Sequence, residues 1–219
     1  MGNMISVTFV NINSEDWLFL KFEIKIRFMK SEADSKEFLL IYGGKMTKKC
    51  VIVMGVCGSG KTSVGLALAS HFNCRFVDGD DLHPRANIDK MASGQPLNDE
   101  DREPWLTRIN DVVYSLKMRS AAGVIVCSAL KKKYRDHIRQ GNDNVCFLHL
   151  YGSFDTIIER MHKRSGHYMK EDMVKSQFDT LQFPGDDEKD VINVDITPSL
   201  DEVIATSIKA VEELEKDVK

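Results

Sequence analysis

The hydrophobic pattern of the chain alternates, from Cys50 onward, between short apolar runs and longer stretches with helical periodicity. Short β-branched runs bounded by turn residues predict strands, whereas apolar residues recurring every three or four positions predict helices. The predicted strands are Cys50–Met54, Arg75–Val77, Gly123–Cys127, Val145–Leu150 and Val191–Val194. The predicted helices are Lys61–Phe72, Arg85–Ala92, Asp101–Arg119, Lys131–Gln140, Phe154–His162, Lys170–Leu181 and Leu200–Lys216. This alternation predicts a three-layer α/β/α domain with a five-stranded parallel sheet.

Residues 1–45 follow a different pattern. The segment from Met4 to Phe28 is rich in Ile, Val, Phe and Trp, and its rough alternation suits a strand or a hairpin. It lacks the compact apolar core and the small-residue cleavage site of a signal peptide. Because Met46 leads directly into the first predicted strand, we expect a dispensable N-terminal extension at 1–45 and the α/β domain at 46–219. The extension would then be upstream sequence that precedes a start at Met46.

Composition and charge are those of an ordinary globular chain. Of the 219 residues, 42% are hydrophobic and 29% are charged, which suits one domain with a well-filled core. The net charge of −3 gives no electrostatic reason to bind nucleic acid or an acidic membrane, and no apolar stretch approaches the ~20 residues that span a bilayer. The cysteines have neither metal-ligand spacing nor a disulfide framework. We interpret them as buried, reduced thiols of a cytoplasmic protein: Cys50, Cys57, Cys74, Cys127 and Cys146.

The segment that follows the first predicted strand has the G-x-x-x-x-G-K-[ST] pattern of a phosphate loop. It consists of Gly55, Val56, Cys57, Gly58, Ser59, Gly60, Lys61 and Thr62. Glycines let backbone N–H groups turn toward a phosphate, and the N-terminus of the following helix attracts the same anion. In such loops the lysine reaches the β- and γ-phosphates, and the hydroxyl ligates Mg²⁺. We therefore predict a nucleoside triphosphate site here, with Lys61 as a catalytic residue and Thr62 as a magnesium ligand.

Two carboxylates after the second predicted strand are candidates for the metal and for the phosphate acceptor. Many phosphate-loop proteins hold Mg²⁺ with an Asp at the end of a strand, but here the strand at 123–127 is followed by Ser128. Asp78 and Asp80 instead follow the strand at 75–77, at the sheet edge where ligands bind. We predict that Asp78 holds Mg²⁺ or its water, and that Asp80 orients the acceptor hydroxyl or takes its proton. The alternative is an acidic surface turn.

Four sequence blocks carry a further signal. The longest contains both carboxylates and covers residues 78–106, beginning Asp78-Gly79-Asp80-Asp81-Leu82-His83-Pro84-Arg85. The three shorter blocks are Cys127–Asp136, Gly166–Met169 and Gln177–Gln182. Together they resemble the signature of gluconokinases of the small phosphate-loop type, from about Lys49 to the C-terminus. The resemblance implies the fold of nucleoside monophosphate and shikimate kinases, with ATP and Mg²⁺ as cofactors. It also implies phosphorylation of D-gluconate at the 6-hydroxyl, giving 6-phospho-D-gluconate and ADP and feeding the pentose phosphate pathway.

The implied substrate carries a carboxylate and several hydroxyls, so its site needs cations and short polar groups. The candidate substrate-binding residues are Asp80, His83, Arg85, Lys131 and Arg135. An arginine suits the carboxylate best because the two groups can form a bidentate pair. Lys131 and Arg135 are four positions apart in a predicted helix, so they would share one face. The alternatives are that His83 closes a turn and that the basic run after Lys131 is a solvated face.

A basic segment near residues 160–170 is predicted to form a lid. Arg160 and Arg164 lie four apart on a predicted helix that ends before Gly166. Closure over ATP would bring guanidinium charge to the transferred phosphate and exclude the water that would hydrolyse ATP. We predict that Arg164, nearest the hinge, is catalytic and that Arg160 contacts the nucleotide. The alternative is a solvated last turn stabilised by the helix dipole.

Pro104 and Trp105 lie near the start of the helix predicted at 101–119. Proline suits a first helical turn, and we expect Trp105 to belong to the core and not to bind a ligand.

Three other functions compete with this one. A kinase of another small acid, such as shikimate, would have the same fold. A GTP-dependent switch needs the guanine-reading Asn-Lys-x-Asp sequence, which the chain lacks. A protein with a dead nucleotide site would have no need of Lys61, Thr62, Asp78 and Asp80 together. The expected partner is therefore a small molecule, D-gluconate, with no nucleic acid or membrane; a homodimer is the candidate assembly, and the oligomeric state is left open.

Overall fold

The computed structural model describes residues 49–163 and 171–216. They belong to one compact unit of the chain, Gly44–Lys219. The predicted extension at 1–45 lies outside the described residues, as does the predicted lid from 164 to 170.

The described strands form one five-stranded sheet, and every neighbouring pair is parallel. They are β1 (Cys50–Met54), β2 (Arg75–Asp78), β3 (Gly123–Val126), β4 (Val145–Tyr151) and β5 (Val191–Asp195). The order across the sheet is β2-β3-β1-β4-β5, so the chain passes from one side of β1 to the other between β3 and β4. Ligands of open parallel sheets bind outside the carboxyl ends of the strands at such a reversal. The predicted strands are confirmed, with ends that differ by at most one residue.

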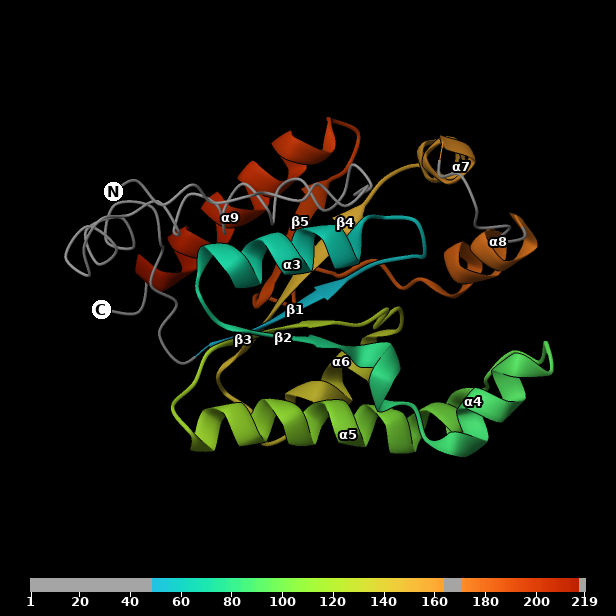
Figure 1. The fold of residues 1–219 in the computed structure, drawn as a ribbon, viewed down its shortest axis with the longest axis horizontal. Coiled ribbons are helices and arrows are strands. Elements are labelled where there is room, and N and C mark those ends of the chain that lie inside the picture. Colours follow the sequence, from blue (N-terminus) through green and yellow to red (C-terminus); the bar gives the residue numbers. More distant parts are fainter. Residues whose placement is uncertain (1–48, 164–170, 217–219) are drawn as a thin grey trace, which may run out of the picture. The chain divides into compact units, whose positions relative to one another are not determined.

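Helices cover both faces of this sheet (Figure 1). Helices α3 and α9 lie on one face and α5 and α6 on the other, while α4, α7 and α8 lie toward the carboxyl edge (Figure 1). The bounds are α3 Lys61–His71, η1 Gly79–Leu82 (a 3₁₀ turn), α4 Arg85–Ala92, α5 Asp99–Met118, α6 Lys132–Arg139, α7 Phe154–Lys163, α8 Glu171–Thr180 and α9 Leu200–Lys216. The predicted α/β/α architecture is therefore confirmed, whereas η1 was not predicted.

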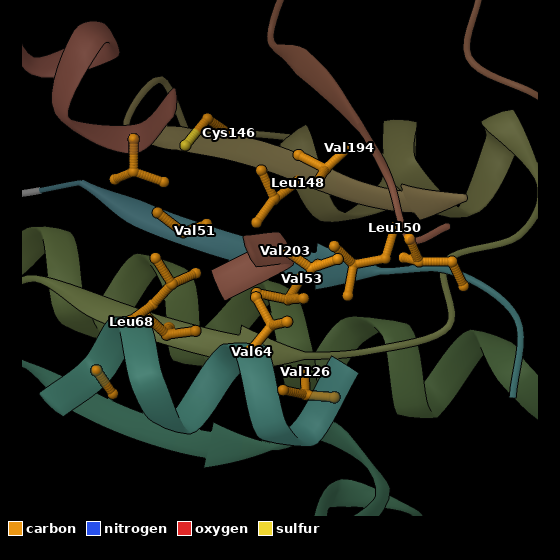
Figure 2. Close-up of a cluster of buried hydrophobic side chains, with 14 of the residues drawn as sticks. Val51, Val53, Val64, Leu68, Val126, Cys146, Leu148, Leu150, Val194 and Val203 are labelled. Carbon is orange, nitrogen blue, oxygen red and sulfur yellow. The ribbon is translucent and has the colours of Figure 1, made fainter. Parts of the chain in front are cut away.

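Alternate residues of the central strand enter two different cores. Val51 and Val53 of β1 face α3 and α9, together with Leu148 and Leu150 of β4 and Val203 of α9 (Figure 2). The intervening residues Cys50, Ile52 and Met54 pack instead against Trp105 and other residues of α5. Burial on both faces explains why β1 is an uninterrupted apolar run, as is typical of parallel sheets.

Helix α5 begins two residues before its predicted start because a capping box fixes its first turn. Asn98 Oδ1 accepts from Asp101 N–H at 2.8 Å, and Asp101 Oδ2 accepts from Asn98 N–H at 2.8 Å. Pro104 consequently lies inside the helix, so the prediction that it occupies the first turn is wrong. Trp105 is 2% exposed, and its predicted place in the core is confirmed.

The predicted burial of the cysteines is confirmed for Cys50, Cys127 and Cys146, and it is wrong for Cys57 and Cys74, which are only half-buried. Cys50 and Cys127 are almost inaccessible to solvent, and burial raises the pKa of Cys50 well above its usual value and that of Cys127 to about 12. Both are therefore protonated and unreactive at neutral pH. No helix in the described part of the chain combines the length and apolar character needed to cross a bilayer.

Candidate active site

The phosphate-loop sequence connects β1 to α3 at the carboxyl edge of the sheet (Figure 1). Gly55 has a φ of 142°, and a Cβ built there would lie 2.5 Å from the Leu150 carbonyl oxygen, so both conformation and space require glycine. Gly58 and Gly60 also have positive φ, at 80° and 92°. Helix α3 begins immediately afterwards, and its first N–H groups have no acceptor within the helix. The segment thus has the form of an anion site.

The Lys61 side chain folds back over this loop. Its Nζ donates to the Val56 carbonyl oxygen at 2.9 Å. Burial lowers the pKa of Lys61, whereas the neighbouring Cys57 thiol and the carboxylates of Asp80 and Asp78 act in the opposite direction. The ammonium group therefore lies within electrostatic reach of both carboxylates at the end of β2.

Asp80 lies on the tight turn η1 that leaves β2, and Asp78, the last residue of β2, caps that turn. Asp78 Oδ1 accepts from Asp80 N–H at 3.0 Å, so the first carboxylate fixes the position of the second residue. A Cβ on Gly79 would lie 2.4 Å from the Val126 carbonyl oxygen, so the turn packs directly against the end of β3. Trp105 Nε1 donates to the Gly79 carbonyl oxygen at 2.6 Å and holds the turn from the α5 side. The Asp80 side chain remains exposed at the sheet edge.

His83 is buried just after this turn. Its ring stacks on Trp105, with centroids 4.4 Å apart and planes inclined by 13°. Asn87 Nδ2, which can only donate, lies 3.2 Å from His83 Nδ1, so this nitrogen accepts and a neutral ring carries its proton on Nε2. Burial lowers the pKa of His83; Asp80 opposes this shift and Arg102 adds to it. At neutral pH the residue is therefore an uncharged hydrogen-bond donor next to Asp80.

Three further basic residues were predicted to bind the acceptor, and the first two differ in their availability. Arg85 is exposed at the start of α4, and its guanidinium makes no hydrogen bond or ion pair with the described residues. Lys131 Nζ lies 2.8 and 3.1 Å from the two carboxylate oxygens of Asp99. Asp99 also accepts from Lys133 Nζ and from the Tyr134 hydroxyl. A substrate carboxylate could therefore bind Lys131 Nζ only by replacing the Asp99 carboxylate.

Arg135 does not face the cleft, and its prediction as a substrate-binding residue is wrong. Its side chain is completely buried, with Nε and Nη2 donating to the two carboxylate oxygens of Glu188 at 2.7 and 2.5 Å. Its Nη1 donates to the carbonyl oxygens of Ala129 and Leu130, both at 3.2 Å. The prediction placed Lys131 and Arg135 on one helical face, but α6 begins only at Lys132 and the preceding residue has extended backbone. The shared face therefore does not exist, and Arg135 is structural.

Replacing Glu188 with glutamine is expected to lower the free energy of unfolding by about 3 kcal/mol, because Arg135 would be left as a buried, unpaired charge. Burial works against ionisation of Glu188, but hydrogen bonds from Arg135 and Arg139 outweigh it and bring the pKa to about 2. A depressed carboxylate pKa stabilises the fold above the ordinary pKa, and this contribution is lost as the pH falls from about 4.5 toward 2. Urea titrations at pH 7 and pH 3 measure both effects.

Asp187→Asn is the matched control for this variant, since Asp187 is an exposed neighbour with only a 3.7 Å contact to Lys132. Its effect is expected to stay below about 0.5 kcal/mol. Equal destabilisation by the two substitutions would contradict the assigned role of Glu188.

Arg160 of α7 lies beside the phosphate loop. Its Nη2 donates to the carbonyl oxygens of Ile196 and Pro198 in the loop between β5 and α9, the latter at 2.9 Å. Its Nη1 lies 3.8 Å from the position that a Cβ on Gly60 would occupy. Arg160 thus connects α7 with the loop after β5, beside the phosphate loop. Arg164 lies outside the described residues, and its catalytic role stays a prediction.

Known proteins resemble this chain over most of its length. A family model described as shikimate kinase matches residues 57–211. The thermoresistant gluconokinase of Escherichia coli (strain K12) is 50% identical over 160 residues, which cover 73% of this chain and 91% of that protein. The thermosensitive gluconokinase of the same strain is 49% identical over 166 residues, covering 76% and 89%. The chain belongs to the gluconokinase family.

The fold agrees with this membership. The crystal structure of a gluconokinase from Sinorhizobium meliloti 1021 superposes with a TM-score of 0.72 at 38% identity, covering 78% of this chain and 95% of that one. The match to the shikimate kinase model agrees with the predicted fold type. The resemblance read from the sequence blocks is therefore confirmed.

Three residues of this gluconokinase-family site were not given a role by the sequence. Asp99 pairs with Lys131, Arg102 lies close enough to influence the pKa of His83, and Gln177 Oε1 accepts from the Cys57 N–H at 2.6 Å. All three lie in or next to blocks that resemble the family. The family resemblance included these residues in its blocks. Their contacts could not be read from the sequence, because the partners lie far apart along the chain.

Proposed function

We propose that the protein transfers the γ-phosphoryl group of ATP to the 6-hydroxyl of D-gluconate, giving 6-phospho-D-gluconate and ADP. The observation that carries this proposal is the 50% identity to a gluconokinase over 91% of its length, in a chain that keeps Lys61, Thr62, Asp78 and Asp80 at one sheet edge. In the reaction, the acceptor oxygen forms a bond to phosphorus as the bond between the γ-phosphorus and its bridging oxygen breaks. The leaving group is ADP.

The phosphate loop would hold the nucleotide. N–H groups of residues 55–62 would surround the phosphates, and Lys61 Nζ, which now donates to the Val56 carbonyl oxygen, would turn to the β- and γ-phosphates. Arg160, already beside Gly60, would lie along the nucleotide. Arg164 would complete the charge around the transferred group; this assignment rests on the lid predicted from the sequence alone.

The residues near the loop suit a magnesium ion. Thr62 is exposed at the start of α3 and Asp78 uses one of its oxygens to cap η1, so the site offers a hydroxyl and a carboxylate oxygen. Mg²⁺ prefers oxygen ligands and usually binds through one or two protein groups together with substrate phosphates. No described cluster of His, Cys, Asp and Glu could hold a metal alone, which fits such a shared site. When bound, the ion neutralises charge on the β- and γ-phosphates.

The gluconate would lie between η1, the start of α4 and the start of α6. Asp80 would accept a hydrogen bond from the 6-hydroxyl, orient it toward the γ-phosphorus and receive its proton. His83 Nε2 would donate to a substrate oxygen. The carboxylate would be bound by Arg85, whose guanidinium is uncommitted among the described residues, and by Lys131 in exchange with Asp99.

A panel of acids tests the proposal. ADP release is measured with D-gluconate, shikimate and other sugar acids at equal concentrations, with and without Mg²⁺. The proposal expects Mg²⁺-dependent turnover with gluconate, and a phosphorus NMR signal of a phosphomonoester on a primary carbon. Turnover with another acid but none with gluconate would overturn it.

Removal of residues 1–45 is expected to change kcat, KM and the melting temperature little, with kinetic constants within about twofold. The three gluconokinases compared above cover 73–78% of this chain but 89–95% of their own lengths. The candidate catalytic residues that we name all lie in 46–219. Kinetics of the 46–219 protein and of the full chain measure this directly, and a tenfold loss of kcat would show that the extension contributes. Intact mass of the natively expressed protein tests the proposed start at Met46.

We also propose that the protein works in the cytoplasm. The thiols of Cys50 and Cys127 form no disulfide and suit a reducing compartment, where disulfides are rare. ATP is available there to the proposed reaction. Sedimentation velocity of the full chain distinguishes a monomer from the homodimer that is the candidate assembly.

A further inference from the structure

One backbone donor of the phosphate loop is engaged by a side chain from another part of the chain. Cys57 N–H donates to Gln177 Oε1 at 2.6 Å, although the two residues are 120 positions apart. Gln177 lies in α8, and its side chain is partly buried. An amide oxygen is therefore held where the loop presents an N–H group.

This contact lies at the end of the loop that serves the terminal phosphates. Lys61 Nζ donates to the carbonyl oxygen of Val56, the residue before Cys57. The lysine of a phosphate loop reaches the β- and γ-phosphates. We therefore infer that Gln177 lies near the position that the γ-phosphate would occupy. It does not lie near the end of the loop that enters α3.

The segment that carries Gln177 is anchored at both ends. Phe178 packs edge-to-face on Phe154 of α7, with ring centroids 5.5 Å apart. Past the end of α8, Gln182 N–H donates to the Leu130 carbonyl oxygen at 2.8 Å, and Gln182 Oε1 accepts from Lys132 N–H at 2.7 Å. The segment 177–182 thus connects the phosphate loop with the start of α6, on the acceptor side. Such anchoring gives the Gln177 carboxamide a defined position.

We propose that Gln177 is a positioning residue for the γ-phosphate and that it makes the site discriminate ATP from ADP. Without nucleotide, its Oε1 holds the Cys57 N–H. When ATP binds, a γ-phosphoryl oxygen takes over this N–H, and the Gln177 Nε2 donates to the same phosphoryl group. A carboxamide can fill both roles because it offers an acceptor and two donors, whereas a carboxylate offers only acceptors. ADP has no group at this position and gains nothing from Gln177.

The inference rests on the proposed use of ATP, and binding measurements with the whole protein test it. Dissociation constants for ADP and for a nonhydrolysable ATP analogue, both with Mg²⁺, are measured by calorimetry for wild type, Gln177→Ala and Gln177→Glu. Gln177→Ala is expected to weaken the ATP analogue about tenfold, because one charge-assisted hydrogen bond is lost. Gln177→Glu is expected to weaken it about 100-fold through repulsion of like charges. ADP binding is expected to change less than about twofold in both variants.

Lys175→Ala is the matched control, since Lys175 is exposed on the same helix. It is expected to bind both nucleotides as wild type does. Equal weakening of ADP and the ATP analogue would reduce Gln177 to a structural role and overturn the inference, as would unchanged binding of both. If Gln177→Ala does not fold, the nearly isosteric Gln177→Glu decides alone. If wild type did not phosphorylate gluconate, the proposed function would be overturned. The dissociation constants of the variants would still decide whether Gln177 discriminates ATP from ADP.

Discussion

Lys61→Met is expected to reduce kcat by about 10²- to 10³-fold, because the substitution removes the charge that would stabilise the transferred phosphoryl group. In the structure, Lys61 Nζ hydrogen-bonds the phosphate loop itself and lies near Asp78 and Asp80. Methionine keeps most of the aliphatic chain, so the first turn of α3 should stay packed. Initial rates at saturating ATP and gluconate measure the effect.

Lys209→Met is the control for this substitution, since Lys209 is an exposed lysine of α9 with only a 4.0 Å contact to Glu213. We expect its kcat to equal that of wild type and the melting temperatures of both variants to stay close to it. A Lys61→Met protein that folds and turns over at more than a tenth of the wild-type rate would contradict the role given to Lys61.

Asp80→Asn is expected to lower kcat by about 10³-fold while leaving ATP binding within about twofold, because the acceptor hydroxyl loses the group that orients it and takes its proton. The structure indicates that this substitution leaves the fold of η1 unchanged. The contact that fixes η1 uses the Asp80 backbone N–H and the Asp78 carboxylate, so the turn does not depend on the side chain that is changed. Turnover and the dissociation constant of ATP, measured on the same preparation, separate transfer from binding.

Asp81→Asn provides the neighbouring control, since Asp81 is also exposed on η1. It is expected to keep wild-type turnover. If Asp80→Asn kept full turnover, or if both variants lost it equally, the acceptor carboxylate would have been assigned wrongly.

The order of the helices and strands was predictable from the sequence because it depends on local patterns. The central apolar run became β1, and the helix predicted at 85–92 was found with the same bounds in α4. The predicted start of α5 was two residues too late. Pro104 indicated a first turn near residue 104, whereas the reciprocal hydrogen bonds of Asn98 and Asp101 start the helix at Asp99. Local chemistry of this kind shifts the ends of helices without changing the fold.

The positions of the candidate site residues were predictable where a motif fixes the backbone, and not where side chains from distant parts of the chain pair. The phosphate loop and Asp80 follow directly from the ends of β1 and β2. The pairing of Arg135 with Glu188 spans 53 residues and reverses the predicted role of the arginine. No periodicity connects such distant partners, because the sheet order brings them together. The substrate, in turn, came from the family resemblance and not from spacing or composition.

The most direct test of the proposed catalytic cleft is a crystal structure with D-gluconate, Mg²⁺ and a nonhydrolysable ATP analogue. The account predicts that the 6-hydroxyl lies within hydrogen-bonding distance of an Asp80 carboxylate oxygen and faces the γ-phosphorus, with the substrate carboxylate at Arg85 or Lys131. A complex in which Asp80 is remote from every gluconate hydroxyl, or in which a different hydroxyl faces the γ-phosphorus, would contradict it.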